Sequence, residues 1–393
     1  MIGFKQTAFD KTIKTNIALQ INVESKYNII PLKKFVIAIN PSRDEFHDIN
    51  GKTLASFIEM SSLGLGTIKN KIDRPISEML SGGYTNFREN DILVAKITPC
   101  MENGKCALAE NLTNHIGFGS TEFHVIRASN KERAKYVLEF INREYIRKVA
   151  ASNMTGASGH RRVPQYFYEQ MPIPDAPQEI IKSIVIEAEA VDKEVEKARK
   201  QIENAELEIK QAFSNATKNA TRILRLNDSR IFNLSIGRRV VSNEVVQNGQ
   251  YLVVSANVRD GFGRINHSVL DDFSVPSVLW GIDGDWMVNY IEKDILFAPT
   301  DHCGVIRVLD ETEIIPKYLT YPLFQAGKRE RFSRANRAST ERVRALTINV
   351  PDIDTQKAVV AKVFECEAQI AKAKVIINDS TKRKQAILDK YLK

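Results

Sequence analysis

Basic side chains gather in two stretches of the chain at spacings suited to contacting an anionic polymer. In the denser stretch, seven cations fall between Lys328 and Arg344, opposed only by Glu330 and Glu341. Ammonium and guanidinium groups neutralise phosphates, and arginine can also donate paired hydrogen bonds to base edges. A solvated helix face with scattered ion pairs is the structural alternative. We predict nucleic-acid contacts from Lys328, Arg329, Arg331, Arg334, Arg337, Arg342 and Arg344.

The earlier basic stretch lies between Arg143 and Arg162. From it we predict contacts by His160, Arg161 and Arg162, because both stretches occur at the same stage of a repeat described below. Polar residues in strand-flanked loops of the first half are candidates for reading base edges. These base-reading candidates are Lys96, Thr98, Lys105, Ser120, Thr121 and Glu122.

Motifs for catalysis are missing from the sequence. An adenine methyltransferase needs an Asn/Asp-Pro-Pro-aromatic motif to hold the flipped base, and the nearest candidate, Asn40–Arg43, has one proline and no aromatic residue. No glycine-rich cofactor loop and no G-x-x-x-x-G-K-[ST] phosphate loop occurs. His115 and His124 lie near Cys100 and Cys106 without zinc-finger spacing. We therefore predict no catalytic residue, no metal site and no cofactor in this chain.

Composition agrees with a basic, globular protein. The 393 residues carry 56 Lys and Arg against 48 Asp and Glu, a net charge of +8, which favours an anionic partner. The four cysteines form no C-x-x-C pair, so we expect reduced thiols rather than disulfides. Neither a signal peptide nor a membrane span is predicted, and we expect a soluble, cytoplasmic protein.

The chain contains an internal repeat. Six short anchors occur in the same order in both halves, with offsets that shrink from 203 to 178, so we expect a longer loop in the first copy. A duplicated module explains this order better than chance. The first copy has Asp91-Ile-Leu, Lys135-Tyr136, Arg162-Val163, Pro174-Asp175, Gln178 and Glu187–Ala190. The second copy has Asp294-Ile-Leu, Lys317-Tyr318, Arg342-Val343, Pro351-Asp352, Gln356 and Glu365–Ala368.

Each copy is predicted to contain a mixed α/β part followed by a long helix. Short β-branched runs predict strands at 92–97, 123–126, 251–255 and 295–298. The helices show apolar residues at alternating steps of three and four, which is the heptad pattern of a coiled coil. Packing of each helix on its own α/β part is the alternative to pairing. The first seam runs through Ile181, Ile184, Ala188, Val191, Val195, Ala198 and Ile202 to Ala212. The second runs through Val359, Val363, Cys366, Ile370, Ala373 and Ile377 and is interrupted at Ser380 and Lys384.

This layout resembles that of type I restriction-modification specificity subunits, the HsdS family, over most of the chain. Gly117–Arg127 looks like a segment recurrent in the target-recognition domains of that family. Thr155–Val163 looks like their Thr-Gly-rich basic loop, and Arg337–Val343 takes the place of the second loop. The second half departs from the pattern at Pro299–Gly304, where a Lys-x-Thr-like segment is expected.

The resemblance implies an α+β fold with two mixed α/β target-recognition domains, each followed by a long helix. The two helices would pair as an antiparallel coiled coil in a pseudo-twofold repeat. It implies a non-catalytic subunit that reads a bipartite, asymmetric site in double-stranded DNA. Two modification (methyltransferase) subunits would dock on the helix seams, and restriction (translocase/nuclease) subunits through them. S-adenosylmethionine, ATP and Mg would be held only by these partners.

The expected domain boundaries follow from the repeat. Two other functions stay open: the specificity chain of a two-subunit type II restriction-modification enzyme, and a coiled-coil scaffold that binds no DNA. We expect an N-terminal extension at 1–26, recognition domains at 27–175 and 219–352, and spacer helices at 176–218 and 353–393.

The heptad seams generate a prediction about the spacing of the two half-sites. Four residues inserted after Ala198, with a matched insertion after Lys374, preserve the heptad phase as a stutter and lengthen each helix by about 6 Å. We expect the assembled complex to prefer the same half-sites with a gap about two base pairs longer. Methylation mapping measures this gap. An unchanged gap with normal activity would contradict the prediction.

Overall fold

The computed structural model describes residues 21–46, 48–157, 159–218 and 220–393, and 1–20 of the expected N-terminal extension lie outside them. Two compact units make up this part of the chain. Unit 1 consists of the described residues up to Lys197 together with Ile376–Lys393, and unit 2 is Ala198–Val375. Both units therefore contain part of each long helix. The domain boundaries expected above stay a prediction.

Unit 1 is built on two four-stranded sheets with the strand orders β2-β9-β6-β7 and β4-β3-β8-β5, and on a small pair, β1 and β10. All neighbours are antiparallel except β3 and β8. The strands are β1 (Ile29–Pro31), β2 (Ala38–Ile39), β3 (Leu54–Ile58), β4 (Ile72–Pro75), β5 (Thr85–Arg88), β6 (Ile92–Ala95), β7 (Cys106–Leu108), β8 (Ile116–Gly119), β9 (Phe123–Arg127) and β10 (Pro172–Pro174). The helices are α2 (Leu32–Phe35), α3 (Ile76–Ser81), α4 (Lys131–Ile141), α5 (Glu144–Ser152), α6 (Gln165–Gln170) and the first half of α7 (Gln178–Lys218).

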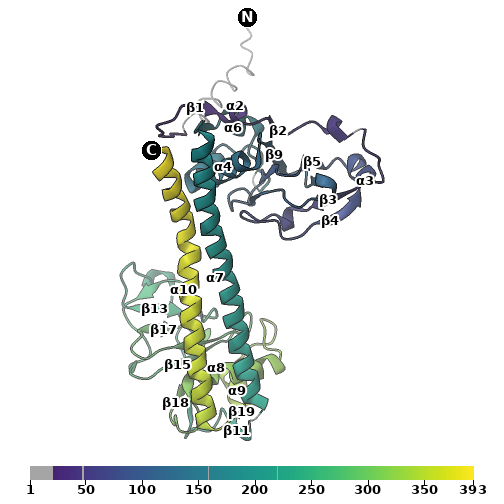
Figure 1. Cartoon of the computed structure of the whole chain (residues 1–393). Helices are drawn as coiled ribbons and strands as arrows, with labels where there is room; N and C mark the ends of the chain where they lie inside the picture. Colours follow the sequence, from purple (N-terminus) through teal and green to yellow (C-terminus); the bar gives the residue numbers. More distant parts are fainter. Residues whose placement is uncertain (1–20, 47, 158, 219) are drawn as a thin grey trace, which may run out of the picture. The chain divides into compact units, whose positions relative to one another are not determined.

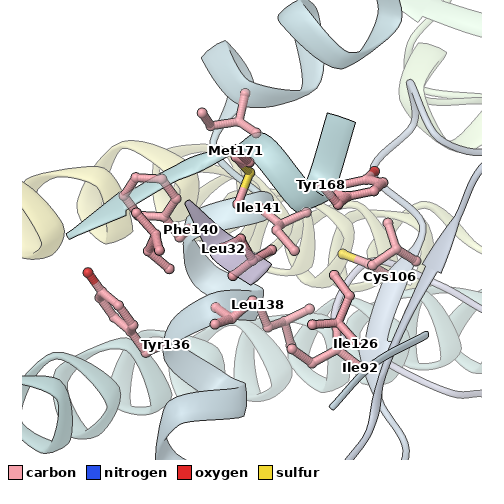
Figure 2. Packing of buried hydrophobic residues seen from close by; sticks show 14 of the residues in the cluster. Leu32, Ile92, Cys106, Ile126, Tyr136, Leu138, Phe140, Ile141, Tyr168 and Met171 are labelled. Atoms are coloured by element: carbon pink, nitrogen blue, oxygen red, sulfur yellow. The ribbon is translucent and has the colours of Figure 1, made fainter. Parts of the chain in front are cut away.

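The main core of unit 1 lies where α4 covers the β9–β6–β7 part of its sheet. Every residue of β6 is buried, as expected for an inner strand covered on both faces. Figure 2 shows Ile92 of β6 and Ile126 of β9 beside Leu138 and Ile141 of α4. This core fixes the end of β6, from which the first candidate loop departs.

Unit 2 repeats this topology, except that its second sheet has no strand corresponding to β5. Its sheets have the orders β12-β18-β15-β16 and β14-β13-β17, with a small β11–β19 pair, and only β13 and β17 are parallel. The strands are β11 (Arg222–Arg225), β12 (Phe232–Ile236), β13 (Tyr251–Val254), β14 (Arg264–Ile265), β15 (Ser277–Gly281), β16 (Val288–Ile291), β17 (Phe297–Pro299), β18 (Cys303–Val308) and β19 (Thr347–Val350). The helices are α8 (Pro316–Arg329), α9 (Thr340–Arg344), the second half of α7 and the first part of α10 (Ile353–Leu392).

The turn between the parallel strand and the following strand is the same in both units. In unit 1 the N–H of Glu122 donates to Ser120 Oγ and that of Phe123 to the carbonyl of Ser120, both at 3.2 Å. In unit 2 the N–H of His302 donates to Thr300 Oγ1 at 3.2 Å, and that of the next residue to the carbonyl of Thr300 at 3.0 Å. The β8–β9 turn therefore corresponds to the β17–β18 turn, and His302 stands where unit 1 has Glu122.

This correspondence corrects two anchors of the repeat. Asp91-Ile-Leu leads into β6, but Asp294-Ile-Leu leads into β17, which is the counterpart of β8, so the two do not match. The inferred longer loop in the first copy therefore loses its basis. Arg342-Val343 lies in α9, whereas Arg162-Val163 lies before α6. Both matches were only two or three residues long, and the fold rather than the local sequence shows that their members do not correspond.

The same correspondence corrects the expected departure at Pro299–Gly304. That segment forms the β17–β18 turn and is not the counterpart of the Lys-x-Thr segment Lys96–Thr98. Lys96 donates its N–H to the carbonyl of Glu122, and Ile282 donates to that of His302. The counterpart of the Lys-x-Thr segment is therefore the one that begins at Ile282.

The two long helices lie side by side (Figure 1), and the predicted antiparallel pairing is confirmed. α7 has 41 residues and α10 has 40. Within unit 1, Glu187 pairs with Lys390 at 2.7 Å; within unit 2, Glu208 pairs with Lys362 at 2.8 Å. Residue numbers rise along α7 as they fall along α10, which requires antiparallel helices. Each helix also packs on its own α/β part, so the alternative reading is partly right.

Two anchors of the repeat recur as the same ion pair. Lys135 of α4 pairs with Glu189 of α7, and Lys317 of α8 pairs with Glu367 of α10 at 2.7 Å. Each lysine belongs to the Lys-Tyr anchor and each glutamate to the Glu-x-Glu-Ala anchor. These matches are confirmed, because they place the long helix on the preceding helix in the same way in both units.

Lys384, which interrupts the second seam, belongs to a cluster of charged side chains in unit 1. Lys384 Nζ lies 2.7 Å from a carboxylate oxygen of both Glu139 and Asp192. Burial raises the pKa of Glu139 against the opposing effect of Lys384. A cation at this seam position is therefore required by a buried carboxylate on α4.

Replacing Lys384 by methionine should destabilise unit 1 strongly at pH 7. The Glu139 side chain is only 13% exposed, and a buried carboxylate left without its cation costs about 3 kcal/mol or more. Urea unfolding measures the loss. Lys390→Met is the matched control, because its pair with Glu187 is largely exposed and should matter little. Equal effects of the two substitutions would contradict this prediction.

Candidate DNA interface

Three separate loops of unit 1 meet at the end of β6. Val163 donates its N–H to the carbonyl of Lys96 at 2.8 Å, and Lys96 donates to that of Glu122 at 2.9 Å. Thr98 donates its N–H to the carbonyl of Arg161 at 3.0 Å. The structure therefore brings together predicted contact residues from the loop after β6, the β8–β9 turn and the basic loop.

Arg162 is held by Glu122 across two hydrogen bonds. Nε lies 2.9 Å from Glu122 Oε2, Nη2 lies 2.6 Å from Oε1, and Nη1 donates to the carbonyl of His160 at 2.8 Å. The arginine side chain is still 43% exposed. These hydrogen bonds lower the pKa of Glu122, so its carboxylate is ionised at neutral pH. The guanidinium is thus oriented without being buried.

A second carboxylate, missed in the sequence, organises the neighbouring residues. Thr98 Oγ1 donates to Glu102 Oε1 at 2.6 Å, and Arg161 lies 3.8 Å from the same oxygen. Glu102 Oε2 is buried without a hydrogen-bond partner among the described residues. No motif marks Glu102 in the sequence, because its role depends on the fold of the loop after β6.

The other predicted residues of unit 1 divide into two groups. Lys105 Nζ donates to the carbonyl of Met60 at 3.2 Å, and Ser120 Oγ shapes the β8–β9 turn, so both side chains serve the fold. Thr121 and His160 are exposed. A DNA contact by any of these four residues stays a prediction.

Buried His124 of β9 fixes the end of the basic loop. Its Nε2 lies 2.8 Å from the carbonyl of Val163, and its Nδ1 lies 3.1 Å from Asn40 Nδ2. A carbonyl only accepts and an amide nitrogen only donates, so Nε2 carries the proton and Nδ1 accepts. Burial lowers the pKa of His124 to about 4. The neutral imidazole therefore holds Val163, one residue after Arg162.

Unit 2 builds the same contact with different residues. Ala338 donates its N–H to the carbonyl of Ile282 at 3.1 Å, and its carbonyl accepts from Trp280 Nε1 at 2.9 Å. Ala338 is thus the counterpart of Val163. Buried Trp280 donates to its carbonyl, as His124 does to the carbonyl of Val163. The residue before Ala338 is Arg337, which makes it the counterpart of Arg162.

Arg337 is also held side-on by a carboxylate. Its Nε contacts Asp283 Oδ1, and its Nη2 donates to Asp283 Oδ2 at 2.9 Å. His302 Nδ1 contacts the same carboxylate. Asp283 comes from the loop after β15, whereas Glu122 comes from the β8–β9 turn. The internal sequence repeat did not reveal this pair, because the carboxylate of unit 2 lies in a different loop from that of unit 1.

The remaining cations of the second stretch do not all face the same way. Arg334 is exposed at the tip of a tight turn closed by Ser333 and Asn336, and Arg331 is exposed beside it. Arg342 lies over the Phe332 ring at 4.8 Å. Lys328 lies over the ring of Phe324, whereas Arg329 and Arg344 donate to the carbonyls of Thr347 and Leu234.

The predicted seam residues are buried or half-buried, as a seam between helices requires. Their expected role in partner docking stays a prediction, and burial does not favour it, because a buried side chain is not available to another subunit. The exposed large apolar residues of α7 and α10 are Ile186, Leu207, Phe364 and Val375.

Metal-binding clusters and membrane spans are both missing from the described part of the chain. No group of three or more His, Cys, Asp or Glu side chains there could hold a metal ion. None of the helices described is long and apolar enough to cross a membrane.

Comparison with known proteins identifies the relatives of this chain, although no family model matches it. The type I restriction enzyme EcoAI specificity subunit of Escherichia coli is 45% identical over 105 residues, 26% of this chain and 18% of that protein. The EcoEI specificity subunit of the same organism is 43% identical over 96 residues, 24% of this chain and 16% of that protein. The predicted resemblance to type I specificity subunits is confirmed.

Solved structures extend the likeness over the whole fold. The S subunit of the type I restriction-modification system from M. genitalium has a TM-score of 0.56 and 14% identity, covering 96% of this chain and 98% of its own. A chain from a structural study of complex assembly in a type I system has a TM-score of 0.55 and 18% identity, with 94% and 98% covered. The fold is that of type I specificity subunits. The sequence match itself spans less than a fifth of either curated relative.

The His124 contact predicts acid sensitivity confined to unit 1. The folded pKa of about 4 lies below the ordinary 6.5, so the unfolded chain binds more protons in this interval. Protonation of His124 therefore leaves the free energy of unfolding almost unchanged above pH 6.5 and lowers it by about 2 kcal/mol at pH 5. His124→Gln, which keeps a donor for Val163, should remove this component.

Urea unfolding at pH 7 and pH 5, followed by circular dichroism, tests the prediction. Tryptophan fluorescence is the internal control, because Trp280 and Trp286 both lie in unit 2 and should not respond to the substitution. The same pH dependence in His124→Gln and in the unchanged chain would contradict the prediction.

Proposed function

We propose that this chain is the DNA-specificity subunit of a type I restriction-modification complex. Each unit reads one half of a bipartite, asymmetric site. The observation that carries the proposal is the recurrence, in both units, of a basic loop anchored beside the end of a buried strand with a carboxylate-held arginine at its base. The names of the relatives, which are type I specificity subunits, support it.

The proposed partners are double-stranded DNA, two modification subunits and, through them, restriction subunits. The chain itself is non-catalytic in this proposal, and S-adenosylmethionine, ATP and Mg are held by the partners. The outer faces of α7 and α10 receive the modification subunits, because the inner faces are buried. A type II specificity chain would share these features, and the genes beside this one distinguish the two systems.

Methylation mapping tests the proposal directly. Deleting the gene should abolish adenine methylation at one split sequence motif in the host genome, and restoring it should restore that motif. The isolated chain should transfer no methyl group from S-adenosylmethionine to DNA. Methylation by the isolated chain, or an unchanged methylome after deletion, would overturn the proposal.

The exposed turn of unit 2 predicts a salt-dependent contribution to DNA affinity. Arg331→Ala combined with Arg334→Ala should weaken binding by the assembled complex. It should also reduce the slope of log affinity against log salt by about 0.9 for each phosphate that the turn no longer neutralises. Arg225→Ala with Arg230→Ala removes the same charge near β11 as a control. Equal slopes in the two variants would show that the turn does not bind phosphate.

A further inference from the structure

Arg162 and Arg337 occupy equivalent positions and are held in the same way. Each precedes the residue whose N–H binds the segment after the inner strand, β6 or β15. In each case a carboxylate contacts both Nε and Nη2, which form the side edge of the guanidinium. Two independent sets of residues thus produce one arrangement, although the carboxylates come from different loops.

The donors left over form a pair. A guanidinium has five N–H groups in one plane. In Arg162, Glu122 binds one on Nε and one on Nη2, and the carbonyl of His160 binds one on Nη1. One N–H on Nη1 and one on Nη2 are therefore left without an acceptor among the described residues. In Arg337, Asp283 also leaves N–H groups on Nη1 and Nη2, and no further acceptor contacts either guanidinium within the described part of the chain.

The net charge of each arginine–carboxylate ion pair favours one of the two chemical groups that can accept from two N–H donors at once. Phosphate oxygens and the O6 and N7 atoms of guanine both accept two parallel N–H groups. A phosphate would approach a carboxylate of like charge, and the ion pair has no net charge to attract it. The guanine edge is neutral, so the carboxylate does not repel it. Exposed ion pairs add little to stability, so the fold gains little from these two.

We infer that Arg162 and Arg337 are guanine-reading residues, one in each unit, and that Glu122 and Asp283 are their positioning residues. The inference rests on the proposed function and deepens it. It predicts a guanine in each half of the DNA site, contacted at O6 and N7 in the major groove. It assigns these two arginines to base recognition rather than to phosphate contact.

Arg230 supplies a matched control within unit 2. It is held side-on by Asp228 at 3.0 and 2.7 Å, so its chemistry is the same. It lies in the turn after β11, away from the basic loop in sequence and without a counterpart pair among the described residues of unit 1. Arg230→Lys should therefore leave sequence preference unchanged.

The experiment uses the full chain reconstituted with its modification subunits. Selection from a randomised duplex library gives the preferred site of the unchanged chain and of Arg162→Lys, Arg337→Lys and Arg230→Lys. Binding is then titrated on duplexes in which single guanines are replaced by 7-deazaguanine, which lacks the N7 acceptor. The unchanged chain should lose about tenfold in affinity at one guanine in each half-site.

Each lysine variant should relax the preference at one base pair by about ten- to a hundredfold and become insensitive to 7-deazaguanine there. The half-site read by the other unit should be unaffected and reports that the protein is folded. Glu122→Gln should lower the preference at the same base pair while raising affinity for unrelated DNA, because it frees a cation. An ion pair with only a structural role would not lower the preference at one base pair while raising the affinity for unrelated DNA.

Three results would overturn the inference. Unchanged preference at every position in Arg162→Lys and Arg337→Lys would exclude a reading role. Equal weakening on all sequences would assign phosphate contacts and leave the proposed function standing. An unchanged chain without any sequence preference would remove the proposed function and the inference together.

Discussion

One backbone hydrogen bond in each unit determines where the basic loop lies. It joins Val163 to Lys96 at 2.8 Å in unit 1 and Ala338 to Ile282 at 3.1 Å in unit 2. The acceptor in each case follows a strand whose residues are all buried, so its position is set by the core. Because the donor follows the loop, the base of the loop is fixed by packing that the loop itself does not supply. The loop is then free to differ between units.

The two loops differ in the number of residues between the pair that closes each of them. In unit 1 Thr155 pairs with Arg162, which leaves six residues between them, and in unit 2 Ser333 pairs with Asn336, which leaves two. Loops on a rigid scaffold are a common place for recognition residues, because they tolerate change in length and sequence. The buried donor that holds the base of the loop also differs, His124 in one unit and Trp280 in the other. The backbone contact is retained while the side chains around it change.

The sequence predicted the elements better than the site. The heptad seam of α7 and the Lys-Tyr and Glu-x-Glu-Ala anchors were predicted, because periodicity and repeated ion pairs leave a local pattern. Asp294-Ile-Leu was assigned to the wrong strand, because a tripeptide before a buried strand has the same local signal at β6 and at β17. Register between strands decides the match, and register is not local. Glu102 and Asp283 were missed for the same reason, since each becomes a partner only after the loops meet.

Under the proposed function, the exchange of carboxylates between loops gives a physical route to an asymmetric DNA site. Glu122 in unit 1 corresponds in position to His302, and the acid of unit 2 has moved to Asp283. The arginine keeps its place on the scaffold in both units, so both keep the same donor pair. What changes is the set of groups around that pair: the carbonyl of His160 and Lys96 in one unit, and His302 in the other. Neighbouring base pairs would therefore meet different donors and acceptors in the two units. A duplicated scaffold can then select two unlike half-sites without any change in its core, because the core fixes only the base of each loop and the position of its arginine.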